Sequence, residues 1–229
     1  MKFKPSYTSS IAEDIMAERL IRAQAVEFLA DAPMRLKSGL ISPVYVDNRK
    51  LFSHPEAWRD IVETMASRVE EYDLEFDIVA GVEAAGSMHA AALAYRLGLP
   101  AIMVRQKAKT YGNHSRIEGG DVKGMRVLLL EDHISTGLSC LDAIRALRGE
   151  GAQVTQVMSI TNYAIPETQR LFKQEGIDTY DVIAFEKVVR KAKEMGVIDD
   201  EHEKLVLEWL QTPWTWAAMH GVVGSVIEN

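Results

Sequence analysis

Short apolar runs alternate with segments of helical periodicity through most of the chain. The runs have the length of strands and lie at residues 77–82, 101–105, 125–131, 153–161 and 180–185. Between them, apolar residues recur at helical spacing in residues 85–97, 138–148 and 166–174. Continuous apolar strands that alternate with helices indicate an α/β fold, with a central, mostly parallel sheet and helices on both faces. Ligands of such sheets bind at the carboxyl ends of the strands.

The first part of the chain predicts a helix over about residues 10–30. Ser10 and Glu13 form a capping-box pattern, and apolar residues such as Leu20 and Phe28 follow at helical spacing. This helix would precede the alternating region and pack on the sheet.

Residues 34–52 contain two short extended runs around a Gly-Ser-Pro turn, which predicts a small hairpin-like hood. Ser53 and Glu56 repeat the capping-box pattern, with Pro55 in the first turn, and predict a helix that runs to about Tyr72. The tail from residue 199 predicts one helix and a packing extension. The expected divisions are an N-terminal helix and hood, an α/β core and a C-terminal helical extension, at residues 1–55, 56–190 and 191–229.

Composition narrows the class of protein. The chain has 229 residues, 47% of them hydrophobic and 26% charged, as in ordinary globular proteins. Its net charge of -7 argues against a general nucleic-acid binder, although a local basic site for phosphates remains compatible. Cys140 is the only cysteine, so the chain forms no intrachain disulfide. The N-terminus lacks the apolar core of a signal peptide, and Arg96, Gly98 and Pro100 interrupt the longest apolar region. We therefore expect a cytoplasmic protein without a membrane span.

The segment "VLLLEDHISTGLS", residues 127–139, places two carboxylates after an apolar strand. Glu131 and Asp132 there can accept hydrogen bonds from vicinal hydroxyls, as on a ribose. Ser135, Thr136, Gly137 and Ser139 follow in a turn whose N–H groups, at the start of the next helix, suit a phosphate. This combination describes a sugar-phosphate site. The alternative is a pair of acids at a strand exit before an ordinary helix cap.

Two further segments carry candidate chemistry. "VRQKAKTYGNHSRIEGG", residues 104–120, is basic and Gly-rich, which is typical of a lid over a polyanion or of a solvated loop; its basic residues are Arg105, Lys107, Lys109 and Arg116. In "LKSGLISPVYVDNRK", Lys37 with Tyr45 and Val46 suits a planar ring that carries negative charge, and the alternative is a plain hairpin. "DDEHE" at 199–203 is interpreted as a helix start and not as a metal site. His89 and Cys140 are interpreted as packing residues.

In the same order along the chain, these segments resemble a known family. Residues 127–139 resemble the ribose-phosphate signature of type I phosphoribosyltransferases. Residues 36–51 are similar to the hood motif of the orotate phosphoribosyltransferase branch, and residues 104–120 to its mobile catalytic loop. The similarity extends from about residue 10 to about 190, and "TPWTWAAMHG" resembles the tail of the longer bacterial members. The resemblance implies the type I phosphoribosyltransferase fold.

The resemblance also implies roles for individual residues. The ribose hydroxyls of phosphoribosyl pyrophosphate would bind to Glu131 and Asp132. Its 5-phosphate would lie in the turn of Ser135, Thr136, Gly137, Leu138 and Ser139. Its pyrophosphate would contact the loop of Glu83, Ala84, Ala85 and Gly86, together with Lys107. The catalytic cations would be Lys109, Arg105 and Lys37. Orotate would contact Lys37, Tyr45, Val46 and Asn162.

The chain departs from the family pattern at a few of these positions. Gln106 stands where lysine is common, and Tyr111 where many members have histidine, with His114 three residues on. Asn162 lies near an arginine of shorter members that pairs with the orotate carboxylate. An asparagine can hydrogen-bond a carboxylate but supplies no charge. His133 replaces the usual aliphatic residue.

The resemblance implies an enzyme that converts orotate and phosphoribosyl pyrophosphate to orotidine 5-phosphate and pyrophosphate in pyrimidine biosynthesis. It implies Mg²⁺ bound mainly through the pyrophosphate, no metal site made of protein ligands alone, and a homodimer whose loop completes the neighbouring site. Neither nucleic acid nor a membrane is an expected partner. The alternatives are a transferase for another base, prompted by Asn162, and a non-catalytic sensor of phosphoribosyl pyrophosphate. A basic lid favours the enzyme over the sensor.

Overall fold

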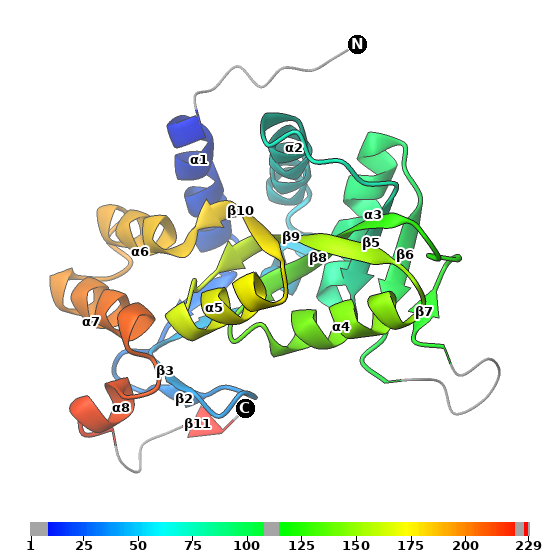
Figure 1. The fold of residues 1–229 in the computed structure, drawn as a ribbon. Coiled ribbons are helices and arrows are strands. Elements are labelled where there is room, and N and C mark those ends of the chain that lie inside the picture. The colour runs from blue at the N-terminus through cyan, green and yellow to red at the C-terminus, as the bar shows by residue number, and fades with distance from the viewer. Residues whose placement is uncertain (1–8, 108–114, 223–226, 229) are drawn as a thin grey trace.

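The computed structural model describes residues 9–107, 115–222 and 227–228. Its centre is a six-stranded sheet in the order β10-β9-β8-β5-β6-β7 (Figure 1). The strands are β5 (Ile78–Val82), β6 (Ala101–Val104), β7 (Ile117–Glu118), β8 (Arg126–Ile134), β9 (Gln153–Asn162) and β10 (Asp178–Ala184). All neighbours are parallel except β6 and β7, which are antiparallel. This arrangement confirms the predicted fold class.

Helices cover both faces of this sheet (Figure 1). One face carries α1 (Ser9–Arg22), α2 (Pro55–Glu71) and α3 (Ala85–Leu97), and the other carries α4 (Leu138–Gly149) and α5 (Pro166–Gln174). The first half of the middle strand β8 carries a run of apolar residues because it is covered on both faces. Leu128 and Leu130 pack in the core under the first three helices, whereas Leu129 packs with residues of α4. All three leucines are fully buried, as expected for a strand covered on both sides.

The hood is built from short strands near the N-terminus. β1 (Val26–Phe28) pairs with β4 (Val44–Val46), and β2 (Met34–Arg35) and β3 (Ile41–Ser42) form the predicted hairpin. Its turn lies at residues 36–40, so it includes Gly39 but not Pro43, which follows β3. The short helix η1 (Asn48–Ser53) connects the hood to α2.

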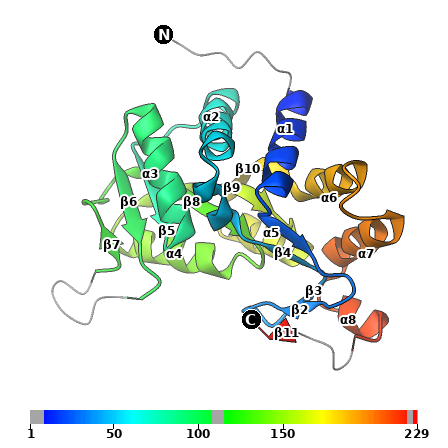
Figure 2. The same ribbon diagram turned by 180° about the vertical axis from the view of Figure 1, so that it is seen from behind.

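The C-terminal part of the chain packs against this hood. It comprises α6 (Phe185–Glu194), α7 (Asp200–Gln211), α8 (Trp216–Met219) and β11 (Ile227–Glu228), and β11 pairs with β2. Figure 2 shows the hood strands beside α7 and α8. Trp209 of α7 is fully buried, and its Nε1 donates a hydrogen bond to the Ile41 carbonyl at 2.8 Å. The division into three domains stays a prediction, but hood and extension share one small sheet.

Several helices and strands begin or end at residues other than those predicted. The first helix ends at Arg22 and not near residue 30, because Gln24 adopts a left-handed conformation (φ 54°) and the chain then forms β1. Ser53 does not cap α2, since it closes η1, and His54 takes the cap position without a side-chain bond. Phe185 begins the unpredicted helix α6 instead of ending a strand. Pairing with distant strands outweighs local periodicity at such boundaries.

Two smaller predictions concern the tail. Asp199 caps α7 by accepting a hydrogen bond from the His202 backbone, which confirms the helix start. Within the described ranges, His, Cys, Asp and Glu side chains form no group of three that could hold a metal ion.

No helix of those ranges has the length and apolar character needed to cross a bilayer.

His89 makes the fold sensitive to acid. It lies buried in α3, its Nδ1 accepts a hydrogen bond from Trp58, and burial lowers its pKa to about 4 from an ordinary 6.5. The unfolded chain therefore binds a proton at this residue below pH 6.5, whereas the folded chain does not until near pH 4. Its contribution to stability is complete above pH 6.5 and is lost as the pH falls.

We expect the free energy of unfolding to fall by about 2 kcal/mol more in the wild type than in His89→Gln between pH 7 and pH 5. Urea denaturation at the two pH values measures this difference. The Gln side chain keeps an acceptor for Trp58 but does not titrate. Equal pH dependence in the two proteins would contradict the assignment.

Candidate active site

A cavity of about 620 Å³ opens at the carboxyl ends of β5 and β8, below the hood. It brings together residues that are far apart in the sequence. The predicted residues that line it are Lys37, Tyr45, Val46, Glu83, Ala84, Ala85, Glu131, Asp132, Ser135, Thr136, Leu138 and Ser139. The structure therefore gathers three separate sequence segments around one space.

The paired carboxylates lie inside β8 and not after it, because the strand continues to Ile134. Glu131 is only 6% exposed, and its carboxylate accepts hydrogen bonds from the Ser139 hydroxyl (3.0 Å) and the Asp132 backbone (3.2 Å). Burial raises the pKa of Glu131 well above its ordinary value, and the neighbouring Asp132 charge raises it further. Burial also raises the pKa of Asp132. Two desolvated acceptors on the cavity wall suit a ligand that brings hydroxyl donors.

The turn after β8 ends in the N-terminus of α4. Gly137 occupies the cap position with φ +72°, and α4 has no side-chain cap, so its first N–H groups remain open to an anion. The Ser135 hydroxyl is buried without a hydrogen-bond partner among the described residues. A Cβ at Gly137 would lie 2.8 Å from Thr168 Cγ2 and 2.9 Å from Phe172 Cζ. Glycine is thus required here by both backbone conformation and space.

The loop between β5 and α3 forms another wall and contains a cis peptide between Glu83 and Ala84. Gly86 does not line the cavity. It lets the loop sit against β8, because a Cβ there would approach the Leu130 carbonyl to 2.7 Å. Gln106 holds the loop from the other side: its backbone N–H donates to Glu83 Oε2 at 3.0 Å and its side-chain amide to the Glu83 carbonyl at 3.1 Å.

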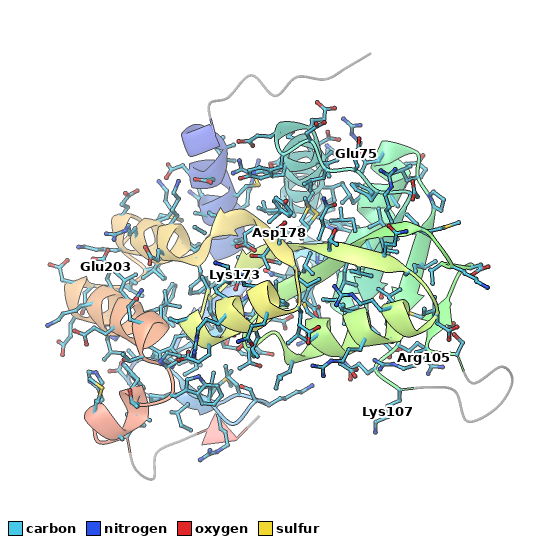
Figure 3. All side chains as sticks on the ribbon, in the orientation of Figure 1. Glu75, Arg105, Lys107, Lys173, Asp178 and Glu203 are labelled. Atoms are coloured by element: carbon cyan, nitrogen blue, oxygen red, sulfur yellow. The ribbon has the colours of Figure 1, made fainter. Side chains whose placement is uncertain are left out.

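The described cations at the start of the basic loop do not reach the cavity, contrary to expectation. Arg105 forms ion pairs with Glu83 (3.8 Å) and Glu118 (3.4 Å), and Lys107 is exposed; neither residue lines the cavity. Figure 3 shows both side chains at the root of the segment drawn in grey. Lys109, with Tyr111 and His114, lies outside the described residues.

Asn162 was predicted to contact the base, but the structure does not bring it to the cavity. It is buried, its Nδ2 donates to Asp181 Oδ2 at 3.3 Å, and its Oδ1 accepts from the Ala164 backbone at 2.8 Å. Ala164 has a positive φ of 53°, so this contact stabilises a strained turn. Burial raises the pKa of Asp181 to about 6, despite hydrogen bonds from Ser159 and Asn162.

Some residues that line the cavity were missed by the sequence reasoning: Asp47, Arg49, Gln106, His133 and Tyr163. Asp47 and Arg49 belong to the hood motif itself, so a wider reading of "VYVDNRK" would have included them. Tyr163 had no local signal, because its place depends on a hydrogen bond from its hydroxyl to the Val44 carbonyl, at 3.2 Å.

The comparisons with known proteins agree with this geometry. Residues 47–194 match the model of the phosphoribosyl transferase domain. The orotate phosphoribosyltransferase of Coxiella burnetii is 41% identical over 88% of this chain and 96% of its own length. That of Sinorhizobium medicae is 36% identical over 99% of this chain and 100% of its own. The chain belongs to the orotate phosphoribosyltransferase family. It is therefore a pentosyltransferase, as the sequence resemblance implied.

Solved structures of this family share the fold. Orotate phosphoribosyltransferase from Aeropyrum pernix superposes with a TM-score of 0.68 at 26% identity, over 80% of this chain and 99% of that one. The Mycobacterium tuberculosis orotate phosphoribosyltransferase in complex with 5-phospho-alpha-D-ribosyl 1-diphosphate gives 0.59 at 26% identity, over 77% and 98%. UMP synthase of Leishmania donovani gives 0.76 at 27% identity, over 87% of this chain, which spans only 42% of that longer protein.

Gly137 offers a direct test of the turn. We expect Gly137→Ala to lower the free energy of unfolding by roughly 1–3 kcal/mol, because the Cβ adds backbone strain and a clash with α5. The control is Gly149→Ala at the end of α4, where nothing lies within 4 Å of the added Cβ. That variant should be unchanged or more stable by up to about 1 kcal/mol. Equal stabilities in urea denaturation would mean that the turn tolerates a side chain.

Proposed function

We propose that this chain transfers the phosphoribosyl group of phosphoribosyl pyrophosphate to orotate, with release of pyrophosphate and with Mg²⁺. The observation that carries the proposal is a single cavity that joins a pair of adjacent carboxylates, an open helix N-terminus and a hood with a lysine. The named relatives support orotate as the base. A transferase for another base and a non-catalytic sensor of the same sugar are the alternatives.

The sugar donor would lie across the ends of β5 and β8. Glu131 and Asp132 accept hydrogen bonds from the 2- and 3-hydroxyls of the ribose, which offsets the burial of these acids. The 5-phosphate occupies the turn from Ser135 to Ser139, where helix N–H groups and the unpartnered Ser135 hydroxyl are donors. The pyrophosphate lies against the loop at 83–86.

Orotate would enter between the hood and the ribose. Tyr45 and Val46 of β4 form a flat wall on the cavity, and Lys37 lies on the hairpin turn between β2 and β3. Its ammonium group can reach both an anionic base and the pyrophosphate as a mobile point charge.

The reaction needs little covalent help from the protein. The acidic ring N–H of orotate first loses its proton to solvent. The bond between the anomeric carbon and the pyrophosphate oxygen then breaks as the deprotonated ring nitrogen forms a bond at the opposite face. The sugar is oxocarbenium-like in between, and negative charge grows on the pyrophosphate. Lys37, Arg105 and Lys109 would stabilise that charge, and the basic loop would exclude water. Most of the rate enhancement would then come from positioning and charge neutralisation.

The residues present fit a Mg²⁺ that is held mainly by the substrate. Glu83, Glu131 and Asp132 offer carboxylate oxygens on the cavity wall, but the described residues contain no ready-made group of three metal ligands. Mg²⁺ prefers phosphate oxygens and waters to all-protein cages. When bound, it would supply positive charge to the departing pyrophosphate.

A homodimer is part of this proposal. In the described structure, Arg105 and Lys107 do not line the cavity of their own chain. A loop that starts there would serve a neighbouring cavity in a two-subunit assembly, as the sequence resemblance implies.

The reaction is tested by the ultraviolet change on mixing protein, orotate, phosphoribosyl pyrophosphate and Mg²⁺. We expect loss of orotate absorbance and stoichiometric release of pyrophosphate. A panel of other bases separates the alternative transferase, which would consume one of them faster than orotate. Donor binding without turnover of any base would identify the sensor instead.

Asp132→Asn should weaken the binding of phosphoribosyl pyrophosphate about ten-fold, or about 1.4 kcal/mol, because a charged acceptor of the ribose hydroxyls is lost. Isothermal titration calorimetry measures the dissociation constant. Asp178→Asn is the control, since Asp178 is exposed at the start of β10, at the other end of the sheet. Unchanged affinity in Asp132→Asn would refute the role of the carboxylate pair.

A further inference from the structure

Few positively charged side chains line the cavity to bind a substrate that carries a carboxylate. Among its described lining residues only Lys37 and Arg49 are positively charged, whereas four carboxylates line it: Asp47, Glu83, Glu131 and Asp132. Asn162, the predicted partner of a base carboxylate, is committed to Asp181 and the Ala164 backbone. A carboxylate on the base therefore needs a partner from elsewhere in the cavity.

Arg49 is held in a fixed orientation by Asp47. Its Nε donates to Asp47 Oδ1 at 2.6 Å and its Nη2 to Oδ2 at 3.0 Å, so the carboxylate grips one side of the guanidinium. The Arg49 backbone N–H also donates to Asp47 Oδ1 at 3.2 Å, which caps η1. Burial alone would raise the pKa of Asp47, but hydrogen bonds from Arg49 and its charge lower it, so the pair stays ionised.

This arrangement leaves the other edge of the guanidinium open. A guanidinium has five N–H groups, and Asp47 uses two of them. The remaining edge, Nη1 and the second N–H of Nη2, has no partner among the described residues. The Arg49 side chain is 60% exposed and lines the cavity. That edge has the geometry for two parallel hydrogen bonds to a second carboxylate.

The backbone beneath Arg49 is anchored. The neighbouring Asn48 is fully buried, and its Nδ2 donates to the Asp132 carbonyl at 2.7 Å and to Thr161 Oγ1 at 3.3 Å. These bonds fasten η1 to β8 and β9 at the floor of the cavity. Arg49 thus lies on the same hood segment as Tyr45 and next to the proposed ribose site, where the base must lie.

We propose that Arg49 binds the carboxylate of the base substrate through its free guanidinium edge, with Asp47 as the positioning residue. This assignment rests on the proposed function, since it requires a base that carries a carboxylate. It places the specificity for orotate in the hood and not on β9. The 5-phosphate and the pyrophosphate have their own donors in the turn at 135–139 and the loop at 83–86, so Arg49 is not needed for either.

The test compares two ligands that differ only in the carboxylate. Orotidine 5-phosphate and uridine 5-phosphate are titrated into the wild type, Arg49→Gln and Arg49→Lys by calorimetry. We expect Arg49→Gln to weaken orotidine 5-phosphate 10- to 100-fold, with less than a two-fold change for uridine 5-phosphate. Arg49→Lys should give a smaller loss, because it keeps the charge but not the two-pronged geometry. The control is Arg170→Gln on the exposed side of α5, which should match the wild type.

The variant Asp47→Asn tests whether Asp47 orients the Arg49 guanidinium. It should reduce the preference for orotidine 5-phosphate by a smaller factor than Arg49→Gln and leave uridine 5-phosphate binding unchanged. A purely structural defect would weaken both nucleotides together.

Two outcomes would overturn the proposal. If Arg49→Gln weakens both nucleotides equally, or neither, Arg49 does not read the carboxylate, and orotate turnover by the wild type would still support the proposed function. If the wild type itself shows no preference for orotidine 5-phosphate and does not consume orotate, the proposed substrate fails together with this assignment.

Discussion

The site depends on one constraint, which is the placement of two adjacent carboxylates in the central strand, Glu131 buried and Asp132 partly buried. Desolvation raises the pKa of both Glu131 and Asp132, so these carboxylates carry an unfavourable desolvation free energy in the middle of the sheet. The surroundings offset part of this cost: Glu131 accepts hydrogen bonds from the Ser139 hydroxyl and the Asp132 backbone N–H, and Asp132 is stabilised by hydrogen bonds with the Glu131 side chain and the His133 backbone. Hydroxyl donors from a sugar can supply what the protein leaves out. In the proposed function, the sugar would be recognised because it completes hydrogen bonds that the fold leaves incomplete.

The hood is the second requirement, and long-range contacts hold it in place. Tyr163 donates to the Val44 carbonyl, Trp209 to the Ile41 carbonyl, and Asn48 to the floor of the cavity. The rings of Tyr163 and Trp209 also pack edge to face at 4.8 Å. The C-terminal extension therefore stabilises the same segment that carries the base-facing residues. Packing of the tail therefore supports the hood residues to which the proposed function assigns the base.

The sequence predicted the parts of the molecule that local pattern determines. Strands β5, β6, β8, β9 and β10 and helices α3 and α5 follow from apolar periodicity, and the turn at Gly137 follows from residue type. The short edge strand β7 was not predicted, because it lies in the polar, Gly-rich segment. The predictions that were wrong concern residues whose structure depends on distant segments. Residues 26–28 form β1 and not a helix because β4 pairs with them, and the Asn162 side chain turns inward because Asp181 on β10 is its partner. Arg49 was missed although its motif was seen, because only the fold shows which side of the hood faces the cavity. Lys109 stays a prediction from resemblance alone.

At the proposed pyrophosphate end of the site, the neutral Gln106 stands where a lysine is common in the family, so one positive charge is missing. Gln106 holds Glu83 with two hydrogen bonds from neutral groups, so the loop is fixed without added positive charge. Arg105 lies 3.8 Å from Glu83 and 3.4 Å from Glu118, and these contacts compete with any phosphate that it is to bind. In the proposed mechanism, pyrophosphate must therefore draw Arg105 away from two carboxylates. That exchange costs little free energy, since a partly exposed ion pair contributes little to stability, and a ligand with the high negative charge of pyrophosphate can therefore displace both carboxylates.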